Sequence, residues 1–256
     1  MLTLIRLRNS FIAISIFSSV MVIPRTSSAA AYRGGSASSV LGGGSTQIGI
    51  VGGVINTNQD YLNTLQSRAN VRGTGGISTA QLNSAYELGI EIGYRFSGTI
   101  ITALLRPSIF YEKQNGGNST GSFDYGVQGF TVFPILRLYP LENDFVKFFI
   151  QFGLGYGSAT TTVQESQANL TAQGSAFGTL TGLGAEFCFT ASHCMTVEAN
   201  YRYLIMERNI VTESGGTFAS GSVSNATVNQ EFEIDGTDAT VRMSGLQFLG
   251  GYTYHF

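Results

Sequence analysis

The chain has 256 residues, of which 43% are hydrophobic and only 12% are charged, and glycine alone accounts for 33 positions. Its 14 basic and 16 acidic residues give a formal charge of −2, which argues against nucleic acid as a partner, because nucleic-acid-binding proteins carry a basic face. Beyond residue 31, no apolar stretch approaches the roughly 20 residues of a spanning helix, which argues against a helical membrane protein.

The beginning of the chain has the parts of a secretory signal peptide. Arg6 and Arg8 precede an apolar run at 11–23, and small residues follow it. Serines interrupt the run, which argues against the alternative of a permanent N-terminal anchor. We expect residues 1–31 to be removed. Because they contain three of the 14 basic residues and none of the 16 acidic ones, 11 basic residues remain and the formal charge becomes −5.

The remaining chain alternates between apolar and small or polar residues with a period of two, the signature of strands. Residues 32–45 are rich in Gly and Ser and are expected to form a flexible lead. Eight strands are predicted, in chain order, at 46–55, 84–96, 99–112, 123–139, 145–157, 175–189, 195–211 and within 239–256. A change of parity predicts a bulge near Pro134.

The connections between these strands alternate in length. Short turns are predicted at 97–98, at 140–144 and around Ala191, and longer polar loops at 56–83, 113–122, 158–174 and 212–238. Helical spacing of apolar residues predicts one turn of surface helix at 60–68. Strict alternation over eight strands leaves both chain ends on the side of the short turns, as in an antiparallel up-and-down barrel.

The distribution of side chains bears on whether such a barrel is soluble or spans a membrane. A soluble barrel also has about eight strands but points its apolar face inward. Here Gly and charged residues share one face of several strands, as in 84–96, where Glu87 and Glu91 alternate with Leu88 and Ile90. Tyr and Phe gather on the other face near the strand ends, where membrane barrels carry aromatic girdles. The pattern favours the membrane barrel.

Two stretches resemble a known family. The last strand ends with aromatic residues at every second position, Tyr252, Tyr254 and Phe256, and residues 148–157 read FFIQFGLGYG. Both features are similar to those of small bacterial outer-membrane barrels, namely the transmembrane part of OmpA-like proteins and the OmpX and OmpW types. The resemblance covers residues 46–256. It implies an all-β, eight-stranded antiparallel up-and-down transmembrane β-barrel, with no peptidoglycan-binding domain.

The same resemblance implies where the protein works and what it meets. It places the barrel in the outer membrane with both termini in the periplasm, in contact with outer-membrane lipid and lipopolysaccharide. In this family the terminal aromatic signature, here Tyr252, Tyr254 and Phe256, is read by the barrel-assembly machinery. A monomer is expected, with no nucleic acid as partner.

The inward polar residues form the first candidate site. They are charges of both signs that share a strand face with Gly: Glu87, Glu91, Arg95, Arg106, Arg137, Lys147, Glu186, Glu198 and Arg202. An eight-stranded interior is just wide enough for side chains to fill, and a buried charge needs a partner. We therefore expect a paired network that closes the interior, with Arg137 opposite Lys147, and Glu198 opposite Gly184. A narrow polar pore is the alternative.

Catalytic and cofactor sites are not expected. The two histidines fall in a predicted short turn, His193, and at the penultimate position, His255, so no Ser–His pair is expected at the outer rim. No nucleotide-binding loop is recognised, because the glycines lie within strands. Cys188, His193 and Cys194 supply three metal-ligand types in one turn, but a fourth ligand is missing. We expect no cofactor and no metal.

The two cysteines are expected to form a disulfide. Cys188 and Cys194 lie symmetrically about Ala191, so a hairpin makes them direct cross-strand partners. Directly opposed residues have Cα atoms about 4.5–5.5 Å apart, within the range of a disulfide, and the periplasm is oxidising. Two reduced cysteines, packed as small apolar residues, are the alternative.

These observations favour a non-enzymatic outer-membrane barrel that presents long extracellular loops and has a structural or surface-binding role. The alternative is a narrow channel for small or apolar solutes, as the resemblance to OmpW-type proteins implies.

Overall fold

The protein is described here from a computed structural model. The structure describes residues 44–71, 79–118, 121–166, 168–218 and 223–256. All of these residues belong to one unit, Ser36–Phe256. The predicted signal peptide, and all of the predicted lead except residues 44 and 45, lie outside the described residues.

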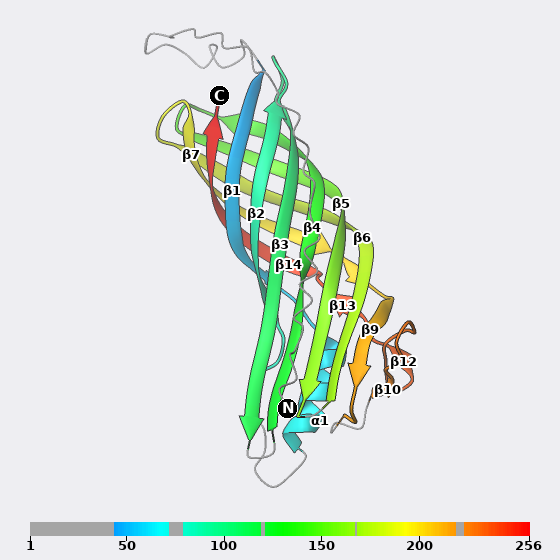
Figure 1. Cartoon of the computed structure of the whole chain (residues 1–256). Helices are drawn as coiled ribbons and strands as arrows, with labels where there is room; N and C mark the ends of the chain where they lie inside the picture. Colours follow the sequence, from blue (N-terminus) through cyan, green and yellow to red (C-terminus); the bar gives the residue numbers. More distant parts are fainter. Residues whose placement is uncertain (1–43, 72–78, 119–120, 167, 219–222) are drawn as a thin grey trace, which may run out of the picture. The chain divides into compact units, whose positions relative to one another are not determined.

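Eight long strands pair in a closed antiparallel ring (Figure 1). They are β1 (Ser45–Asn56), β2 (Ser84–Arg95), β3 (Ile101–Asn118), β4 (Gly121–Glu142), β5 (Val146–Glu165), β6 (Ala168–Cys188), β7 (His193–Tyr203) and β14 (Gly245–His255). Each pairs with its neighbour along the chain, β7 pairs with β14, and the β1–β14 pair closes the ring. The predicted eight-stranded up-and-down barrel is therefore confirmed.

The ring has two different ends. At one end, which we call the turn end, the short connections 96–100, 143–145 and 189–192 lie together with the start of β1 and the end of β14. At the opposite end, the loop end, β3 to β6 extend beyond the shorter strands of the ring, in the direction of α1 (Figure 1). The long connections 57–83 and 204–244 also leave the ring at the loop end.

Two of the four loops predicted at the loop end are mostly strand. The segment 113–122 continues the β3–β4 ladder, and 158–174 continues the β5–β6 ladder as far as Glu165 and Ala168. Their Gly, Ser, Thr and Asn residues predict loops, because such residues are common in turns. In the structure these residues are held by strand neighbours on both sides, and the ladder overrides the local preference.

The predicted bulge at Pro134 is wrong. The register between β4 and β5 is continuous from Phe123 to Leu138 and shifts between Leu138 and Leu141. The apparent change of parity arises because Phe133 and Ile135 are apolar and yet point inward, where they are buried. Apolar residues therefore occupy both faces of this part of β4.

The two long connections fold together over the inner face of the extended sheet. The first contains α1 (Asp60–Val71), which confirms the predicted helix and extends it. The second contains β8 (Ile205–Met206), β9 (Asn209–Gly215), β10 (Val223–Asn225), β11 (Glu233–Ile234), β12 (Thr237–Asp238) and β13 (Val241–Arg242). The predicted strand 195–211 is thus interrupted after Tyr203. β9 then pairs with β6 in the register beyond β7.

A hydrophobic core joins these connections to the sheet. On α1, Leu62, Leu65 and Ala69 are buried at helical spacing. They belong to one cluster with inward residues of β3–β6 and with residues of the second connection: Phe110, Phe123, Tyr125, Val127, Val163, Leu170, Phe232, Ile234, Val241 and Met243 among others. Within the described residues, no helix is long and apolar enough to cross a membrane.

Candidate functional site

The outer surface of the ring is an apolar belt. In β2, Leu88, Ile90 and Ile92 are 57%, 49% and 51% exposed, whereas Glu87 and Glu91 between them are buried. Outward residues of the other strands follow the same rule, among them Ile50, Leu105, Ile109, Phe148, Phe152, Leu183, Val197 and Phe248. Exposed apolar surface of this extent is costly in water but suited to the hydrocarbon of a bilayer.

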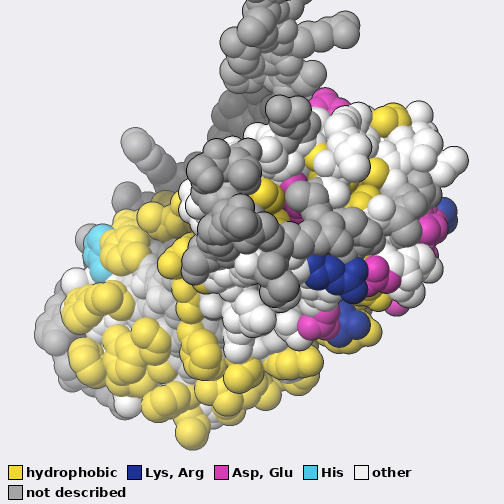
Figure 2. All heavy atoms as spheres, turned by 90° about the horizontal axis from the view of Figure 1, so that it is seen from below, with side chains coloured by type: hydrophobic (Ala, Val, Ile, Leu, Met, Phe, Trp, Pro, Cys, Tyr) yellow, Lys and Arg dark blue, Asp and Glu magenta, His cyan; other side chains and the backbone are white. Residues whose placement is uncertain are grey.

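Aromatic residues mark both edges of the belt. The aromatic residues near the turn end are Tyr94, Phe96, Phe145, Phe189, Tyr252 and Phe256. Those toward the loop end are Tyr86, Tyr111, Phe130, Tyr156, Phe177, Tyr201 and Tyr203. Viewed from the loop end, hydrophobic side chains gather on one part of the surface and charged side chains on another (Figure 2). The chain has the architecture of a small transmembrane β-barrel.

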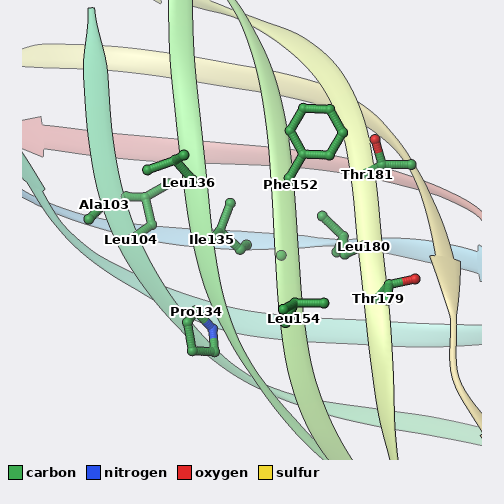
Figure 3. Close-up of a pocket in the computed structure, with 11 residues that line it drawn as sticks. Ala103, Leu104, Pro134, Ile135, Leu136, Phe152, Leu154, Thr179, Leu180 and Thr181 are labelled. Atoms are coloured by element: carbon green, nitrogen blue, oxygen red, sulfur yellow. The ribbon is translucent and has the colours of Figure 1, made fainter. Parts of the chain in front are cut away.

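The belt is hollowed between β3 and β6. A groove of about 660 Å³ is lined mainly by apolar residues of four adjacent strands, including Ala103, Pro134, Phe152 and Leu154 (Figure 3). Gly153 lies in its wall. Because the groove lies within the apolar belt, it has the chemistry to accept a lipid acyl chain rather than a polar ligand.

Inside the ring, the first ion-pair cluster is centred on Arg106 of β3. Its guanidinium contacts Glu91 of β2, and its Nη2 lies 2.7 Å and 2.9 Å from the two carboxylate oxygens of Glu198 on β7. The Arg106 side chain is 2% exposed and the two carboxylates are fully buried. The contact spans the interior, because β3 and β7 are not neighbours in the ring.

Arg137 of β4 joins this cluster to a third carboxylate. Its Nη2 lies 3.1 Å from Glu91 Oε1 and 3.8 Å from Glu198 Oε2, and its Nη1 donates to Glu186 Oε1 at 3.1 Å. The guanidinium also stacks 4.0 Å from the centre of the Phe149 ring. Two arginines and three glutamates from five strands thus form one connected group in the interior.

A second ion pair lies nearer the loop end. Arg202 Nη1 donates to Glu87 Oε2 at 2.7 Å, and Arg202 Nε donates to the Met243 carbonyl at 3.0 Å. Ser108 donates to the other oxygen of Glu87 at 2.5 Å, and Gln247 Nε2 reaches Glu87 Oε2 at 2.7 Å. Each charge therefore has an opposite charge or a polar partner, as burial requires.

Three amide side chains connect the first ion-pair cluster to the second ion pair. Sequence reasoning missed these three side chains. Gln151 accepts from Arg137 Nε at 3.0 Å and donates to Asn200 Oδ1 at 2.6 Å. Asn200 donates in turn to Gln247 Oε1 at 3.2 Å. Their inward parity is visible in the sequence, but the predicted interior site contains charged residues only.

Seven of the nine predicted lumen residues are buried, and the other two lie at the turn end. Arg95 pairs with Glu142 at 2.5 Å and lies 5.0 Å over the Tyr139 ring. Lys147 is partly buried and is aligned with Glu142 and Glu186 in the two ladders, but no ion pair of Lys147 occurs within the described part of the chain. The expected alignment of Arg137 with Lys147 across β4 and β5 is wrong.

The reason is the register of the β4–β5 hairpin. Arg137 is opposite Gln151, because β4 continues to Glu142 and the hairpin turns about Asp144. The expected alignment of Glu198 with Gly184 does occur.

The inner surface is not polar throughout. Leu104, Phe133, Ile135 and Leu180 form a small buried apolar cluster. Inward glycines make room for large side chains: a Cβ on Gly155 would lie 2.5 Å from Phe133. The interior is therefore filled by a polar network and an apolar cluster.

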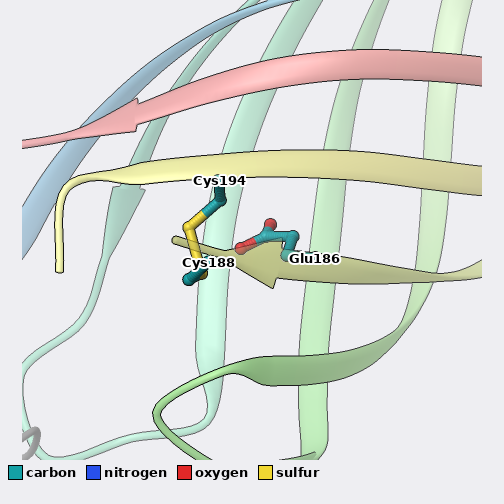
Figure 4. Close-up of side chains that lie close together, drawn as sticks. All are labelled: Glu186, Cys188 and Cys194. Carbon is teal, nitrogen blue, oxygen red and sulfur yellow. A yellow bond between two sulfur atoms is a disulfide. The ribbon is translucent and has the colours of Figure 1, made fainter. Parts of the chain in front are cut away.

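The predicted disulfide is present. Cys188 and Cys194 are direct cross-strand partners and their sulfur atoms are bonded. Glu186 lies beside them (Figure 4). Among the described residues, Glu186, Cys188 and Cys194 have ligand atoms close enough together to hold a metal ion. However, the two sulfur atoms are bonded to each other, so only one carboxylate remains as a ligand.

Both histidines lie at the turn end. His193 begins β7 and contacts the hydroxyl of Tyr252, and His255 ends β14 with its Nε2 3.5 Å from Glu186 Oε2. The aromatic residues of the last strand lie against β1: Tyr252 and Tyr254 are opposite Ile50 and Ile48. Phe256 donates its N–H to the Thr46 carbonyl at 2.9 Å.

At the loop end the two long connections are joined to each other and to the wall. Gln59 exchanges hydrogen bonds with the backbone of Arg242, at 2.9 Å and 3.1 Å, and Thr57 donates to Glu112 of β3 at 2.9 Å. Arg68 of α1 and Asp235 form two hydrogen bonds of 2.7 Å, which lower the pKa of Asp235. These contacts and the core beneath them make an ordered cover, which we call the loop-end cover.

Comparisons with known proteins found similar folds only. No family model and no curated protein matches the chain. Solved structures that are similar include the N-terminal β-barrel domain of Pseudomonas aeruginosa OprF, with 10% identity and a TM-score of 0.39. The attachment invasion locus protein Ail of Yersinia pestis has 15% identity and a TM-score of 0.35. Each similarity covers 84% of this chain and 99% of the other.

The outer membrane protein AlkL, solved in lipid bilayers, has 14% identity and a TM-score of 0.34 over 88% of this chain and 95% of its own. The closed ring of paired strands, rather than these similarities, establishes the fold.

Proposed function

We propose that the chain is a non-enzymatic, closed barrel of the bacterial outer membrane that holds a rigid binding surface outside the cell. The observation that carries this proposal is the filled interior, in which Arg106, Arg137 and Arg202 are fully buried and paired with carboxylates. We infer that such contents leave no continuous aqueous path through the described part of the barrel.

The two ends of the ring support the proposed orientation in the membrane. Small outer-membrane barrels have short periplasmic turns and longer extracellular loops. The turn end, with both ends of the ring, is therefore periplasmic, and the loop-end cover is extracellular. We infer that residues 1–31 direct export, that Tyr252, Tyr254 and Phe256 are read by the barrel-assembly machinery, and that the monomeric barrel contacts outer-membrane lipid and lipopolysaccharide.

The orientation can be tested with the two lysines. The chain contains only Lys113 and Lys147. Lys113 lies on the loop-end part of β3, and Lys147 lies at the turn end. An amine reagent that does not cross membranes, applied to intact cells, should modify Lys113 and spare Lys147, as mapped by mass spectrometry. A Lys113→Arg variant is the matched control, and modification of Lys147 alone would reverse the orientation.

The closed interior can be tested by conductance. The refolded mature chain should give no channel events in planar bilayers. An Arg137→Ala, Gln151→Gly double variant opens the network and should raise conductance, whereas Arg95→Ala at the turn end should not. Regular channel openings by the unmodified chain would contradict a closed barrel.

Transport of small apolar solutes is the second candidate. The observation that favours it is the apolar cluster of Leu104, Phe133, Ile135 and Leu180 inside the ring. Uptake of an apolar solute by vesicles that contain the refolded chain, without ionic conductance, would favour transport over the closed platform.

A further inference from the structure

The outer face of the loop-end sheet carries a shallow hollow. Three strands present outward residues there in a regular grid, because Lys113, Gly126 and Thr162 are directly opposed across β3, β4 and β5. The row on one side contains Tyr111 and Gln128, and the row on the other contains Asp124 and Gln164. The centre of the grid, Gly126, has no side chain, and the hollow around it has a volume of about 280 Å³.

Neither packing nor backbone conformation requires glycine at position 126. A Cβ there would approach no atom closer than 3.5 Å, and the backbone is not in the left-handed region. Inward glycines differ, since a Cβ on Gly184 would lie 2.4 Å from Phe149. Glycine within a strand destabilises it relative to a residue with a side chain, and often marks a close approach by a ligand. The missing side chain is what makes the hollow.

The lining groups combine the features that recognise a sugar ring. Tyr111 is 48% exposed and offers an aromatic face to the apolar C–H groups of such a ring. Gln128, Thr162 and Gln164 supply amide and hydroxyl groups that both donate and accept hydrogen bonds.

The charges argue for a neutral ligand. Lys113 Nζ lies 3.4 Å from Asp124 Oδ2, so each charge already has an opposite neighbour. An anion would meet the Asp124 carboxylate and a cation would meet the Lys113 ammonium. A neutral hydroxyl group can donate to the carboxylate and accept from the ammonium, and such charge-assisted hydrogen bonds are stronger than neutral ones.

We propose that this hollow, lined by Tyr111, Lys113, Asp124, Gln128 and Gln164 around Gly126, binds a neutral hexose-type sugar unit. The inference rests on the proposed function for its exposure outside the cell. The hollow lies next to Tyr111 and so beside the outer edge of the apolar belt, at the depth where sugars of the outer leaflet meet the protein. Its volume suits about one sugar ring and lies near the lower end of ligand sites, roughly 300–1,000 Å³.

The test uses the mature chain refolded into phospholipid nanodiscs that contain no lipopolysaccharide. The probes are the methyl glycosides of glucose, galactose, mannose and N-acetylglucosamine, observed by saturation-transfer difference NMR. We expect saturation transfer to at least one glycoside, and a Gly126→Val variant should weaken its binding by about tenfold or more. Ser175→Val is the control. Ser175 lies on the outward face of β6, outside the hollow, so this change should leave binding unchanged.

The outcomes separate the proposals. If Gly126→Val does not fold, the Lys113→Gln, Asp124→Asn double variant takes its place. Failure of all four glycosides to give transfer above empty nanodiscs, or unchanged binding in the variant, would overturn the sugar site. The lysine modification and the conductance test of the barrel would be unaffected. Adding lipopolysaccharide to the nanodiscs identifies the source of the sugar: competition indicates a leaflet glycan, and undisturbed binding indicates a glycan from outside.

Discussion

At the scale of single residues, the stability of the interior depends on charged side chains that are buried away from water. Arg137 lies among three carboxylates, those of Glu91, Glu186 and Glu198, and against the Phe149 ring. Removing one partner of a buried ion pair is strongly destabilising, because the remaining charge stays buried without compensation. Partly exposed pairs are worth much less, since water and salt screen them.

The first prediction compares two arginines on these grounds. Arg137→Gln should lower the free energy of unfolding by about 3–5 kcal/mol. The matched change Arg95→Gln, in the pair with Glu142 near the rim, should cost about 1 kcal/mol or less. Urea titration of both variants refolded in lipid vesicles measures the difference. Equal losses in the two variants would contradict the account of the buried network.

The second prediction concerns glycines on the two faces of the wall. Gly184→Ala should cost about 1–3 kcal/mol, because the new Cβ meets Phe149 and the Val197 carbonyl in a filled interior. Gly250→Ala should be close to neutral, since no atom lies within 4 Å of its Cβ position. Unfolding of both variants by the same titration decides it, and a tolerated Gly184→Ala would mean that the interior has free volume.

At the scale of elements, the loop-end cover behaves as a small folded layer rather than as loops. α1 buries Leu62 and Leu65 against the inner face of the extended sheet. In the same core, the Tyr125 hydroxyl donates to Glu165 at 2.9 Å, and burial together with that carboxylate raises the pKa of Tyr125. The hydroxyl therefore stays protonated and keeps its hydrogen bond.

The third prediction is that the cover opens separately from the ring. Leu65→Ala should destabilise the cover by about 2–5 kcal/mol through loss of burial and a cavity. Hydrogen exchange of the amides of α1 and β9 should then become faster, while exchange in β2 and β14 stays slow. Asp235→Asn, which weakens only the exposed pair with Arg68, is the control and should leave exchange nearly unchanged. Equal acceleration in all four elements would mean that the cover and the ring unfold together.

At the scale of the whole molecule, the belt and the loop-end sheet share one continuous outward face with two chemistries. Along β5 the outward residues change from Phe148, Ile150 and Phe152 near the turn end to Thr160, Thr162 and Gln164 near the loop end. The change occurs at Tyr156, at the aromatic edge of the belt toward the loop end. This position is where a bilayer would end and the aqueous side begin.

The fourth prediction uses this boundary. Ile90→Arg, in the middle of the belt, should cost about 2–4 kcal/mol of folding stability in a bilayer. Gln164→Arg, on the outward face beyond the boundary, should cost close to nothing. Stability of both variants in lipid vesicles is the measurement, and an unchanged Ile90→Arg protein would mean that Ile90 does not face lipid.

Sequence reasoning worked wherever one local pattern determined the answer. The Cys188–Cys194 pair followed from symmetry about one short hairpin, and the register there agrees. The same reasoning failed for Arg137 and Lys147, because β4 continues to Glu142 and the hairpin turns about Asp144, beyond the centre of the predicted turn. It also missed the hollow around Gly126, because Gly126 lies in the predicted strand 123–139 but its partners Lys113 and Thr162 fall in segments predicted as loops.

The sequence by itself determined the ring: eight strands, their inward and outward faces, and the two cysteines that meet. A period of two is enough for this, because lipid-facing and interior residues must alternate along every strand. Only the tertiary structure decided which interior charges meet, since Arg106 and Glu198 lie 92 positions apart in the sequence and face each other across the ring. It alone also decided that the long connections form a cover, because their apolar residues become a core only against inward residues of β3–β6, which come from other parts of the chain.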